Sequence, residues 1–411
     1  MTETSKRIAI VGAGIVGVSA AVWLQRAGHE VILIDRAGPG EGTSFGNGGI
    51  LASCSVVPVN VPGLMKIAPK MLFSPNQPLF LKWSYVPKLL PWLLKYMSHC
   101  NPESSRRIAS ALFGVVGDSL SEHQALARGT VAEKWIVPAD YLFLYNNRKH
   151  FADDAFGWSL RKNLGLNWDE LEGQEFVDYD PIFSRDLGFA ARFGEHGVIA
   201  DPGQYVKDLA QTVVQNGGQQ IKAEIDDFVH ENGRLTGVRA GGETIDCECA
   251  VLATGVWSAT LAKKLGLTIP LESERGYHIE LWEPNMVPRA PVMVASGRFV
   301  ITPMEGRIRL AGVVEFGGLD APPSKAPIRL LQKNIQAAIP GLKWKETKEW
   351  MGHRPAPSDS IPIIGEAPNF KGAWLGFGHH HIGLTGGPKT GRLLSQLIGG
   401  QTPNIDVAPY S

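Results

Sequence analysis

This sequence is poor in cysteine, in net charge and in long apolar runs, and each shortage excludes a class of protein. Its 411 residues include 40 basic and 40 acidic side chains, so the formal net charge is zero. A basic face that binds nucleic acid needs a surplus of lysine and arginine, so we expect no nucleic-acid partner. The four cysteines form no CxxC pair, which favours a reduced, cytoplasmic compartment and predicts no metal site.

No stretch of the sequence has the length and apolar character of a membrane-spanning helix. The most apolar candidate, residues 79–97, is interrupted by three lysines and two prolines. The polar residues 1–7 are followed by glycines instead of a signal-peptide cleavage site, so we expect no secretory leader. The length, with 44% hydrophobic residues, predicts two or three domains with buried cores.

Glycine, in contrast, is abundant, at 47 of 411 residues, and its first cluster forms a nucleotide-binding pattern. Residues 6–11 predict a short buried strand, and the GAGIVG run that follows opens a helix and leads to a second apolar strand ending at Asp35. In this pattern Gly12 makes the tight turn, Gly14 lets the backbone approach a pyrophosphate, and Gly17 lets the helix pack close to the strand. We therefore predict a dinucleotide site, with Asp35 accepting hydrogen bonds from a ribose.

A second glycine-rich loop follows at residues 42–49. Thr43, Ser44 and Asn47 give it hydroxyl and amide groups, which suits a loop that holds a second part of a long cofactor. The alternative is a polar surface loop, because such loops are common between elements. These motifs alone do not separate FAD from NAD.

Three later segments complete a family pattern: residues 251–258 (VLATGVWS), 354–365 (RPAPSDSIPIIG) and 376–383 (GFGHHHIG). With the glycine motifs they make nearly the whole chain resemble the FAD-dependent D-amino-acid oxidase superfamily, in particular the bacterial D-amino-acid dehydrogenases. The resemblance implies an α/β fold: a Rossmann-type FAD-binding domain with a discontinuous, inserted α+β substrate domain built on a largely antiparallel sheet. The FAD-binding domain would comprise residues 1–53, 196–274 and 355–411, and the substrate domain residues 54–195 and 275–354.

The resemblance also implies which residues contact FAD. They are Gly12, Gly14, Ile15, Val16, Asp35, Arg36, Thr43, Ser44, Asn47, Gly48, Gly49, Ile50, Ile225, Ala253, Thr254, Gly255, Gly378, His379, Ile382, Gly383, Leu384 and Thr385. After the last of these, we expect a helix from Lys389 to Leu397. Its N-terminus would direct positive potential at the pyrimidine edge of the flavin, where negative charge develops on reduction.

Two side chains are candidates for holding a substrate carboxylate. An arginine fork binds both carboxylate oxygens at once, and by resemblance Arg354 is that arginine. The alternative is a salt bridge at the surface or between domains. Tyr277 is the second candidate, as a hydroxyl donor or a wall of the pocket. However, alternation along its strand places Tyr277 with Ile279 and Leu281 on one face, which also fits a core residue.

The run of three histidines at residues 379–381 is a weak metal signal. Consecutive residues of an extended loop point in different directions, and no acidic or cysteine partner stands at ligand spacing nearby. We expect no metal there. By its position, His380 is the histidine that we expect to face the substrate pocket.

The function implied by the resemblance is FAD-dependent oxidative deamination. The substrate would be a D-amino acid or a cyclic imino acid such as a D-proline derivative, and a hydride would pass from Cα to flavin N5. Two alternatives stay open: a glycine/sarcosine-type amine oxidase that uses oxygen, and a non-catalytic flavin-binding redox subunit.

Aromatic side chains and lysines alternate over residues 73–97, where Trp83, Tyr85, Trp92 and Tyr96 lie. This composition suits contact with a membrane interface. The dehydrogenases that the chain resembles pass electrons to the respiratory chain, which implies a respiratory quinone as acceptor and a peripheral position on the inner face of the cell membrane. The alternative is a lid packed against its own protein.

Overall fold

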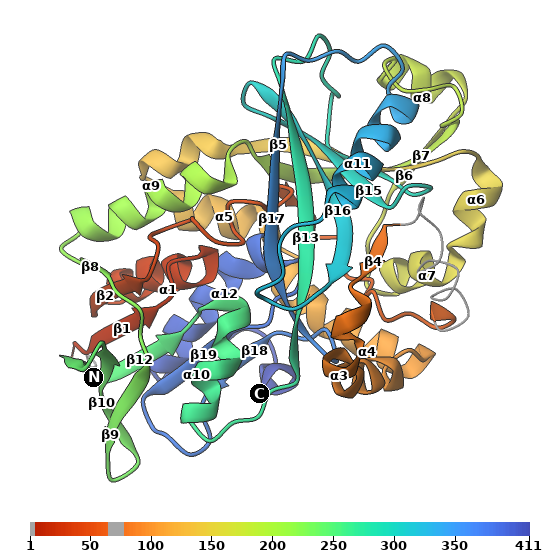
Figure 1. The fold of residues 1–411 in the computed structure, drawn as a ribbon. Coiled ribbons are helices and arrows are strands. Elements are labelled where there is room, and N and C mark those ends of the chain that lie inside the picture. Colours follow the sequence, from red (N-terminus) through yellow and green to blue (C-terminus); the bar gives the residue numbers. More distant parts are fainter. Residues whose placement is uncertain (1–4, 65–77) are drawn as a thin grey trace.

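The computed structural model describes residues 5–64 and 78–411, which are arranged around two large sheets (Figure 1). The six-stranded sheet has the order β18 (Ile363–Glu366), β19 (Ala373–Phe377), β12 (Cys249–Leu252), β1 (Arg7–Val11), β2 (Glu30–Asp35) and β8 (Gln219–Lys222). All its pairings are parallel except that of β18 with β19. Its central strands are buried on both faces, as is usual for parallel sheets.

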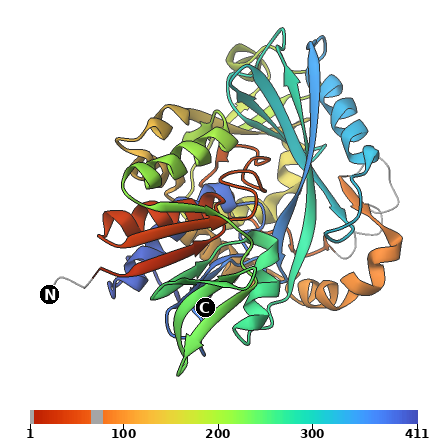
Figure 2. The ribbon, with the colours of Figure 1, turned by 60° about the vertical axis from the view of Figure 1, so that its left-hand side comes forward.

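This sheet is the middle of three layers. One face packs against α1 (Ile15–Arg26), α9 (Pro202–Gln215) and α12 (Gly383–Ile398). The other face packs against α10 (Ser258–Lys264) and a small sheet of β9 (Asp227–Glu231), β10 (Arg234–Ala240) and β11 (Glu243–Asp246). Figure 2 shows the small sheet projecting at the lower edge of the molecule.

Local sequence signals account for several elements of this part of the molecule. The predicted strand, glycine turn, helix and second strand appear as β1, α1 and β2. The side chain of Asp201 accepts a hydrogen bond from the backbone N–H of Gln204, so it caps α9. Asn232 and Gly233 have φ values of 50° and 76°, as a tight hairpin turn requires.

Helix α12 begins six residues before the predicted start. We expected a helix from Lys389, but α12 spans Gly383–Ile398 and contains Pro388. A proline offers no N–H to the carbonyl four residues earlier. That carbonyl, of Leu384, instead accepts a hydrogen bond from Nε2 of His123 at 2.9 Å. The prediction was wrong because the sequence does not show which distant donor replaces the missing N–H.

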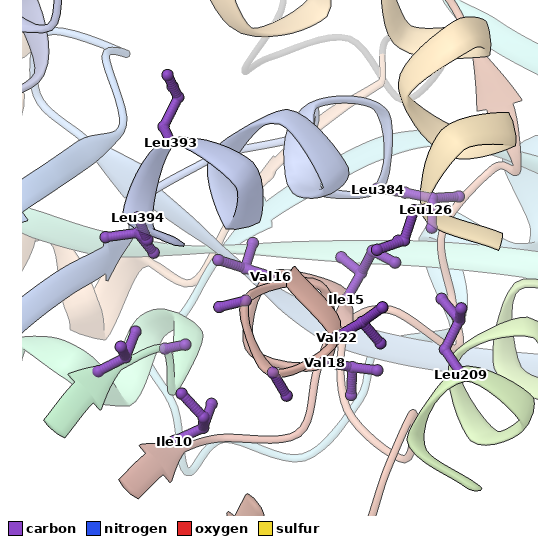
Figure 3. Packing of buried hydrophobic residues seen from close by; sticks show 14 of the residues in the cluster. Ile10, Ile15, Val16, Val18, Val22, Leu126, Leu209, Leu384, Leu393 and Leu394 are labelled. Atoms are coloured by element: carbon purple, nitrogen blue, oxygen red, sulfur yellow. The ribbon is translucent and has the colours of Figure 1, made fainter. Parts of the chain in front are cut away.

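Helix α12 lies directly against α1, and Figure 3 shows apolar side chains filling the space around the two helices. A Cβ on Gly391 would come within 2.5 Å of the Ser19 backbone, and one on Gly387 within 2.9 Å of the Ile15 side chain. The close approach fixes the N-terminal ends of both helices next to each other.

The second sheet has ten strands and is largely antiparallel, as expected. Its main path has the order β17 (Glu346–Pro357), β13 (Leu271–Trp282), β16 (Arg307–Phe316), β15 (Phe299–Met304), β14 (Val292–Val294), β5 (Ile136–Tyr145), β7 (Phe189–Ile199) and β3 (Ile50–Leu51). Two short strands complete it: β4 (Leu79–Leu81) pairs with β16, and β6 (Asp169–Glu172) with β7. Helix α11 (Lys325–Ala338) packs on one of its faces.

The two large sheets draw on interleaved segments of the chain, and the domain boundaries given above stay a prediction. The remaining helices are α3 (Val86–Ser98), α4 (Pro102–Val116), α5 (Ser119–Ala127), α6 (Arg148–Asp153), α7 (Ala155–Asn163) and α8 (Gln174–Tyr179), of which α4 and α5 pack into the core beside α12 (Figure 1). Residues 73–77 of the aromatic stretch lie outside the described residues. In the described chain, no helix is both long and apolar enough to span a membrane.

Candidate active site

A cavity of about 560 Å³ lies at the carboxyl ends of β1, β2, β12 and β19. This edge is where open α/β sheets bind their ligands. Most residues predicted to contact FAD line this cavity: Gly12, Gly14, Ile15, Val16, Asp35, Arg36, Thr43, Ser44, Asn47, Ile225, Ala253, Thr254, Gly255, Gly378, His379, Gly383 and Leu384. Segments from four distant parts of the chain therefore meet at one site.

Five of the predicted FAD residues are not among the residues that line the cavity in the described chain: Gly48, Gly49, Ile50, Ile382 and Thr385. Two of them join neighbouring segments, because Oγ1 of Thr385 donates a hydrogen bond to the Ile50 carbonyl at 3.2 Å. The backbone N–H of Gly49 donates to Oδ1 of Asn47 at 2.9 Å, which shapes the loop from inside.

The glycines of the first motif bring strand and helix together at the cavity. Gly12 has a φ of 108°, and a Cβ there would lie 2.5 Å from the Ala253 carbonyl oxygen. Gly14 is the N-cap of α1 and has no side chain that could cap the helix. The N–H of Ile15 donates to Oγ of Ser44 at 3.0 Å, which ties the second loop to this helix end. A helix N-terminus of this kind attracts phosphate.

Asp35 organises its own loop as well as facing the cavity. Its carboxylate accepts hydrogen bonds from the backbone N–H groups of Ala13, Ala37 and Gly38, at 2.8–3.0 Å. The next residue, Arg36, lies over the Trp257 ring at 4.2 Å. The sequence analysis missed Trp257, although it belongs to the VLATGVWS segment.

The loop of residues 42–49 lines the cavity, so the alternative of a plain surface loop is not supported. Arg309 holds it, because its Nη1 donates to the carbonyls of Phe45 and Asn47 at 2.8 and 2.6 Å. The fully buried Arg309 is paired with Glu280. Burial would raise the pKa of Glu280, but Arg309 and Arg307 lower it to about 2.

The three consecutive histidines point to different partners, as expected. Nε2 of His379 lies 2.8 Å from Oγ1 of Thr390, and desolvation lowers the pKa of His379 to about 4. His380 is hydrogen-bonded to Glu274, and His381 is exposed. Among the described residues, no group of three His, Cys, Asp or Glu side chains is placed to hold a metal ion.

Arg354 stands next to the cavity, between residues of β13 and the histidine turn. It lies directly opposite Glu274 on the neighbouring strand, in the register of β13 and β17. Its guanidinium lies over Gly276, where an added Cβ would come within 2.6 Å of Cζ. Desolvation lowers the pKa of Arg354, and Glu274 opposes that shift. Within the described chain, its side chain makes one long hydrogen bond, from Nη1 to the Val313 carbonyl at 3.4 Å.

Tyr277 does not share this face, which corrects the prediction that its hydroxyl reaches a substrate carboxylate. Side chains alternate along β13, and Tyr277 packs with the core beneath α11. Its hydroxyl donates to Oε2 of Glu315 at 2.7 Å and accepts from the N–H of Ser324 at 2.9 Å. The alternative given above, a core residue, is the one that the structure shows.

The sequence analysis also missed three residues around Arg354. Glu274 and His381 interact electrostatically with it, and Trp350 lies four residues earlier on the same face of β17. Trp350 stacks on His278 with ring centroids 4.9 Å apart and covers Gly46. Acidic residues at 272, 274 and 280 within a buried strand were the signal that could have indicated a polar site there.

Two glycines show that the cavity admits a ligand against the backbone. Gly42 and Gly255 line it, and a Cβ on either would meet no protein atom within 4 Å. With the N-terminus of α1 at Gly14 and an acidic residue at the end of β2, this arrangement suits a dinucleotide. Fold and cavity thus define a Rossmann-type dinucleotide-binding protein with a large antiparallel sheet beside the nucleotide site.

A family model described as FAD dependent oxidoreductase (DAO) matches residues 7–397. The chain belongs to this family, so it is an FAD-dependent oxidoreductase. A D-amino-acid oxidase of Bradyrhizobium diazoefficiens is 36% identical, over 99% of this chain and 98% of its own length. A D-amino acid dehydrogenase of Ralstonia nicotianae is 30% identical, over 98% and 99%.

Solved structures show the same fold. Glycine oxidase from Geobacillus kaustophilus superimposes with a TM-score of 0.75 at 20% identity, over 99% of this chain and 98% of that one. L-proline dehydrogenase from P. horikoshii gives a TM-score of 0.75 at 19% identity, over 99% and 97%.

Proposed function

We propose that this enzyme oxidises a D-amino acid or a cyclic imino acid such as a D-proline derivative. FAD, held in the cavity, would accept a hydride from the substrate Cα at its N5 atom. The names of the two relatives and the position of Arg354 support this substrate class. The imine product would hydrolyse when it is acyclic and persist when it is cyclic.

The cofactor contacts are part of the proposal. The backbone from Gly12 to Val16 and the end of α1 would hold the pyrophosphate, and Asp35 the adenosine ribose. The loop of residues 43–50, with the segments at 253–255 and 378–385, would enclose the flavin. The N-terminus of α12 would stabilise negative charge on the reduced ring.

The single observation that carries the proposal is the placement of Arg354. An arginine that is partly buried and desolvated favours an acidic partner, yet among the described residues Arg354 has no ion pair within 4.0 Å. Its neighbours Pro355 and His380 line the cavity. A substrate carboxylate at this fork would pair the charge and fix Cα beside the cavity.

The test is anaerobic bleaching of the bound flavin by a panel of D-, L- and N-alkyl amino acids. We expect bleaching by D-amino acids or by cyclic imino acids, and none by the L-enantiomers. The oxidation of glycine and sarcosine would favour the glycine/sarcosine-type alternative. If no member of the panel bleached the flavin, the proposal would fail.

The electron acceptor is a second part of the proposal. One relative is named an oxidase and another a dehydrogenase, so oxygen and a respiratory quinone are both candidates. We favour the quinone because of the surface at α3. Reoxidation of the reduced enzyme by a soluble quinone should outpace reoxidation by air-saturated buffer; the reverse order would assign oxygen as the acceptor.

The surface at α3 fits an anionic membrane interface. Trp83, Leu90 and Leu94 are 59%, 46% and 59% exposed. Lys88 and Lys95 are exposed on the same helix. Trp92 and Tyr96 instead point inward, with ring centroids 4.7 Å apart, and pack against β17 and β16. The helix is therefore a packed element with a mixed apolar and basic outer face.

Vesicle pelleting tests this contact. The enzyme should pellet with anionic phospholipid vesicles at low salt, and a variant with Leu90→Ser and Leu94→Ser should not. A matched control is Val214→Ser, at an exposed position of α9, which should pellet like the wild type. Absence of wild-type association at low salt would exclude the membrane proposal.

A further inference from the structure

A cluster of polar side chains beside Arg354 is not explained by carboxylate binding. The carboxylate of Glu274 is hydrogen-bonded to Nε2 of His380, and the two side chains are only 5% and 3% exposed. A carboxylate in such a place is stable only when it is paired. Glu274 lies opposite Arg354 in the strand register and is hydrogen-bonded to His380 of the histidine turn. The three residues therefore lie together at the end of the cavity.

The backbone holds His380 in this position against its own preference. Its φ is 51°, in the left-handed region that residues other than glycine rarely adopt. Its N–H donates to the Pro355 carbonyl at 2.9 Å, which fixes the turn to β17. Strained backbone conformations of this kind cluster at functional sites. The strain points to a function for the ring of His380.

His381 extends the cluster outward. Its Nδ1 lies 3.4 Å from Nδ1 of His380. Desolvation of its ring by the surrounding protein is the largest cause that lowers the pKa of His381 to about 3, and the charge of Arg354 adds to it. A neutral His381 that donates from Nδ1 offers Nε2 as a hydrogen-bond acceptor.

We propose that Glu274, His380 and His381 form a proton relay that deprotonates the ammonium group of the substrate. This inference rests on the proposed function, because Arg354 would place that group beside His381. An N–H bond of the ammonium breaks as Nε2 of His381 gains the proton, and the Nδ1 proton of His381 passes to Nδ1 of His380.

The step moves protons and no electrons. It leaves a neutral substrate amine, His381 in its other neutral tautomer, and an imidazolium at His380 balanced by Glu274. A neutral amine is the form whose lone pair can assist removal of hydride from Cα. His381 is the group that touches the substrate, and Glu274 is a positioning residue.

The charges around the relay favour this direction. Burial would raise the pKa of Glu274, but His380, and after it Arg354, outweigh burial and lower that pKa. The carboxylate thus stays ionised and stabilises a positive His380. Tyr96 of α3 and Glu272 of β13 also interact with Glu274, and burial is the largest cause that raises the pKa of each.

The test is the pH dependence of kcat/KM for a D-amino acid that bleaches the flavin, measured for Glu274→Gln and His381→Asn. Both variants should lose about 10²-fold at pH 7, where the substrate is an ammonium. The deficit should shrink to about threefold near pH 10, where the substrate amine is already neutral. His381 is exposed, so its variant should fold even where that of Glu274 does not.

The matched control is Glu272→Gln, a buried carboxylate on the same strand that is hydrogen-bonded to Tyr85 instead of a histidine. It should follow the wild-type profile. A second readout is binding of the carboxylic acid that lacks the amino group, measured by calorimetry; both relay variants should bind it like the wild type. An equal loss at every pH, or a loss of carboxylate binding, would overturn the relay. Failure of the wild type to bleach with any substrate would instead overturn the proposed function.

Discussion

The two faces of the β13–β17 pair each carry a buried polar cluster, and the clusters differ in how their charges are paired. Beneath α11, Arg275 lies 3.0 Å from Glu315, whose carboxylate also accepts from Tyr277 and Ser324. On the opposite face, Glu274 is paired with His380, while the side chain of Arg354 makes one long hydrogen bond within the described chain.

The difference separates a structural network from a site. Burying a charge is unfavourable unless the protein or a ligand supplies the opposite charge. The cluster under α11 supplies it internally and lies away from the cavity. In the cluster around Arg354, the protein does not supply an ion-pair partner for the guanidinium within the described chain, so a bound ligand would have to supply the opposite charge. Residue type alone does not make this distinction, because each cluster contains an arginine and a glutamate.

The largest effect that we predict is on stability, from Glu315→Ala. This change leaves Arg275 buried without its counter-charge, so the free energy of unfolding should fall by about 3–5 kcal/mol. Urea unfolding followed by circular dichroism measures it. Glu349→Ala, which removes an exposed ion pair with Lys325, is the control and should change stability by about 0–1 kcal/mol. Equal effects of the two changes would contradict the comparison.

Arg354→Met should act on catalysis instead. Loss of the guanidinium that holds the substrate carboxylate should lower kcat/KM, by an amount that corresponds to about 2–5 kcal/mol of transition-state stabilisation. The FAD content should stay that of the wild type. Steady-state kinetics with the best substrate of the panel measures the loss. Arg289→Met, at an exposed site, should leave kcat/KM unchanged. An unchanged kcat/KM in Arg354→Met would remove the carboxylate assignment.

Glu280 sharpens the comparison, because it lies on the same face as Arg354 but at the far end of β13. Arg307 and Arg309 lie 2.7 and 2.6 Å from it and lower its pKa from 4.5 to about 2. A lowered pKa contributes stability above pH 4.5 that is lost as the pH falls toward 2. The shift corresponds to about 3 kcal/mol.

Unfolding measured between pH 7 and pH 2 tests this pairing. Glu280→Gln should be less stable than the wild type by about 3 kcal/mol at pH 7, and the two proteins should converge as the pH approaches 2. A constant difference across this range would show that Glu280 contributes through packing and not through its charge.

The sequence could predict the elements whose signals are local. The glycine turn at Gly12 and the Asp201 cap of α9 depend on neighbouring residues, and both are found. Contacts between distant residues could not be predicted. His380 and Glu274 are 106 positions apart, and their pairing depends on how the histidine turn is fixed to β17.

The same limit explains the errors. Alternation along β13 placed Tyr277 on a face but could not say which face lies toward the cavity. Pro388 marked a helix start by local rules, yet His123 compensates for its missing N–H from another helix. In both cases the deciding partner is distant in sequence.

Tyr277→Phe should have the smallest effect and is the most direct comparison of the two faces. Removing the hydroxyl takes one hydrogen bond from Glu315 and one acceptor from the N–H of Ser324, so the free energy of unfolding should fall by about 1 kcal/mol. Because the hydroxyl lies on the face away from Arg354, kcat/KM should stay that of the wild type. If Tyr277→Phe instead lowered kcat/KM tenfold or more without loss of stability, Tyr277 would belong to the site, and the difference between the two faces would not hold.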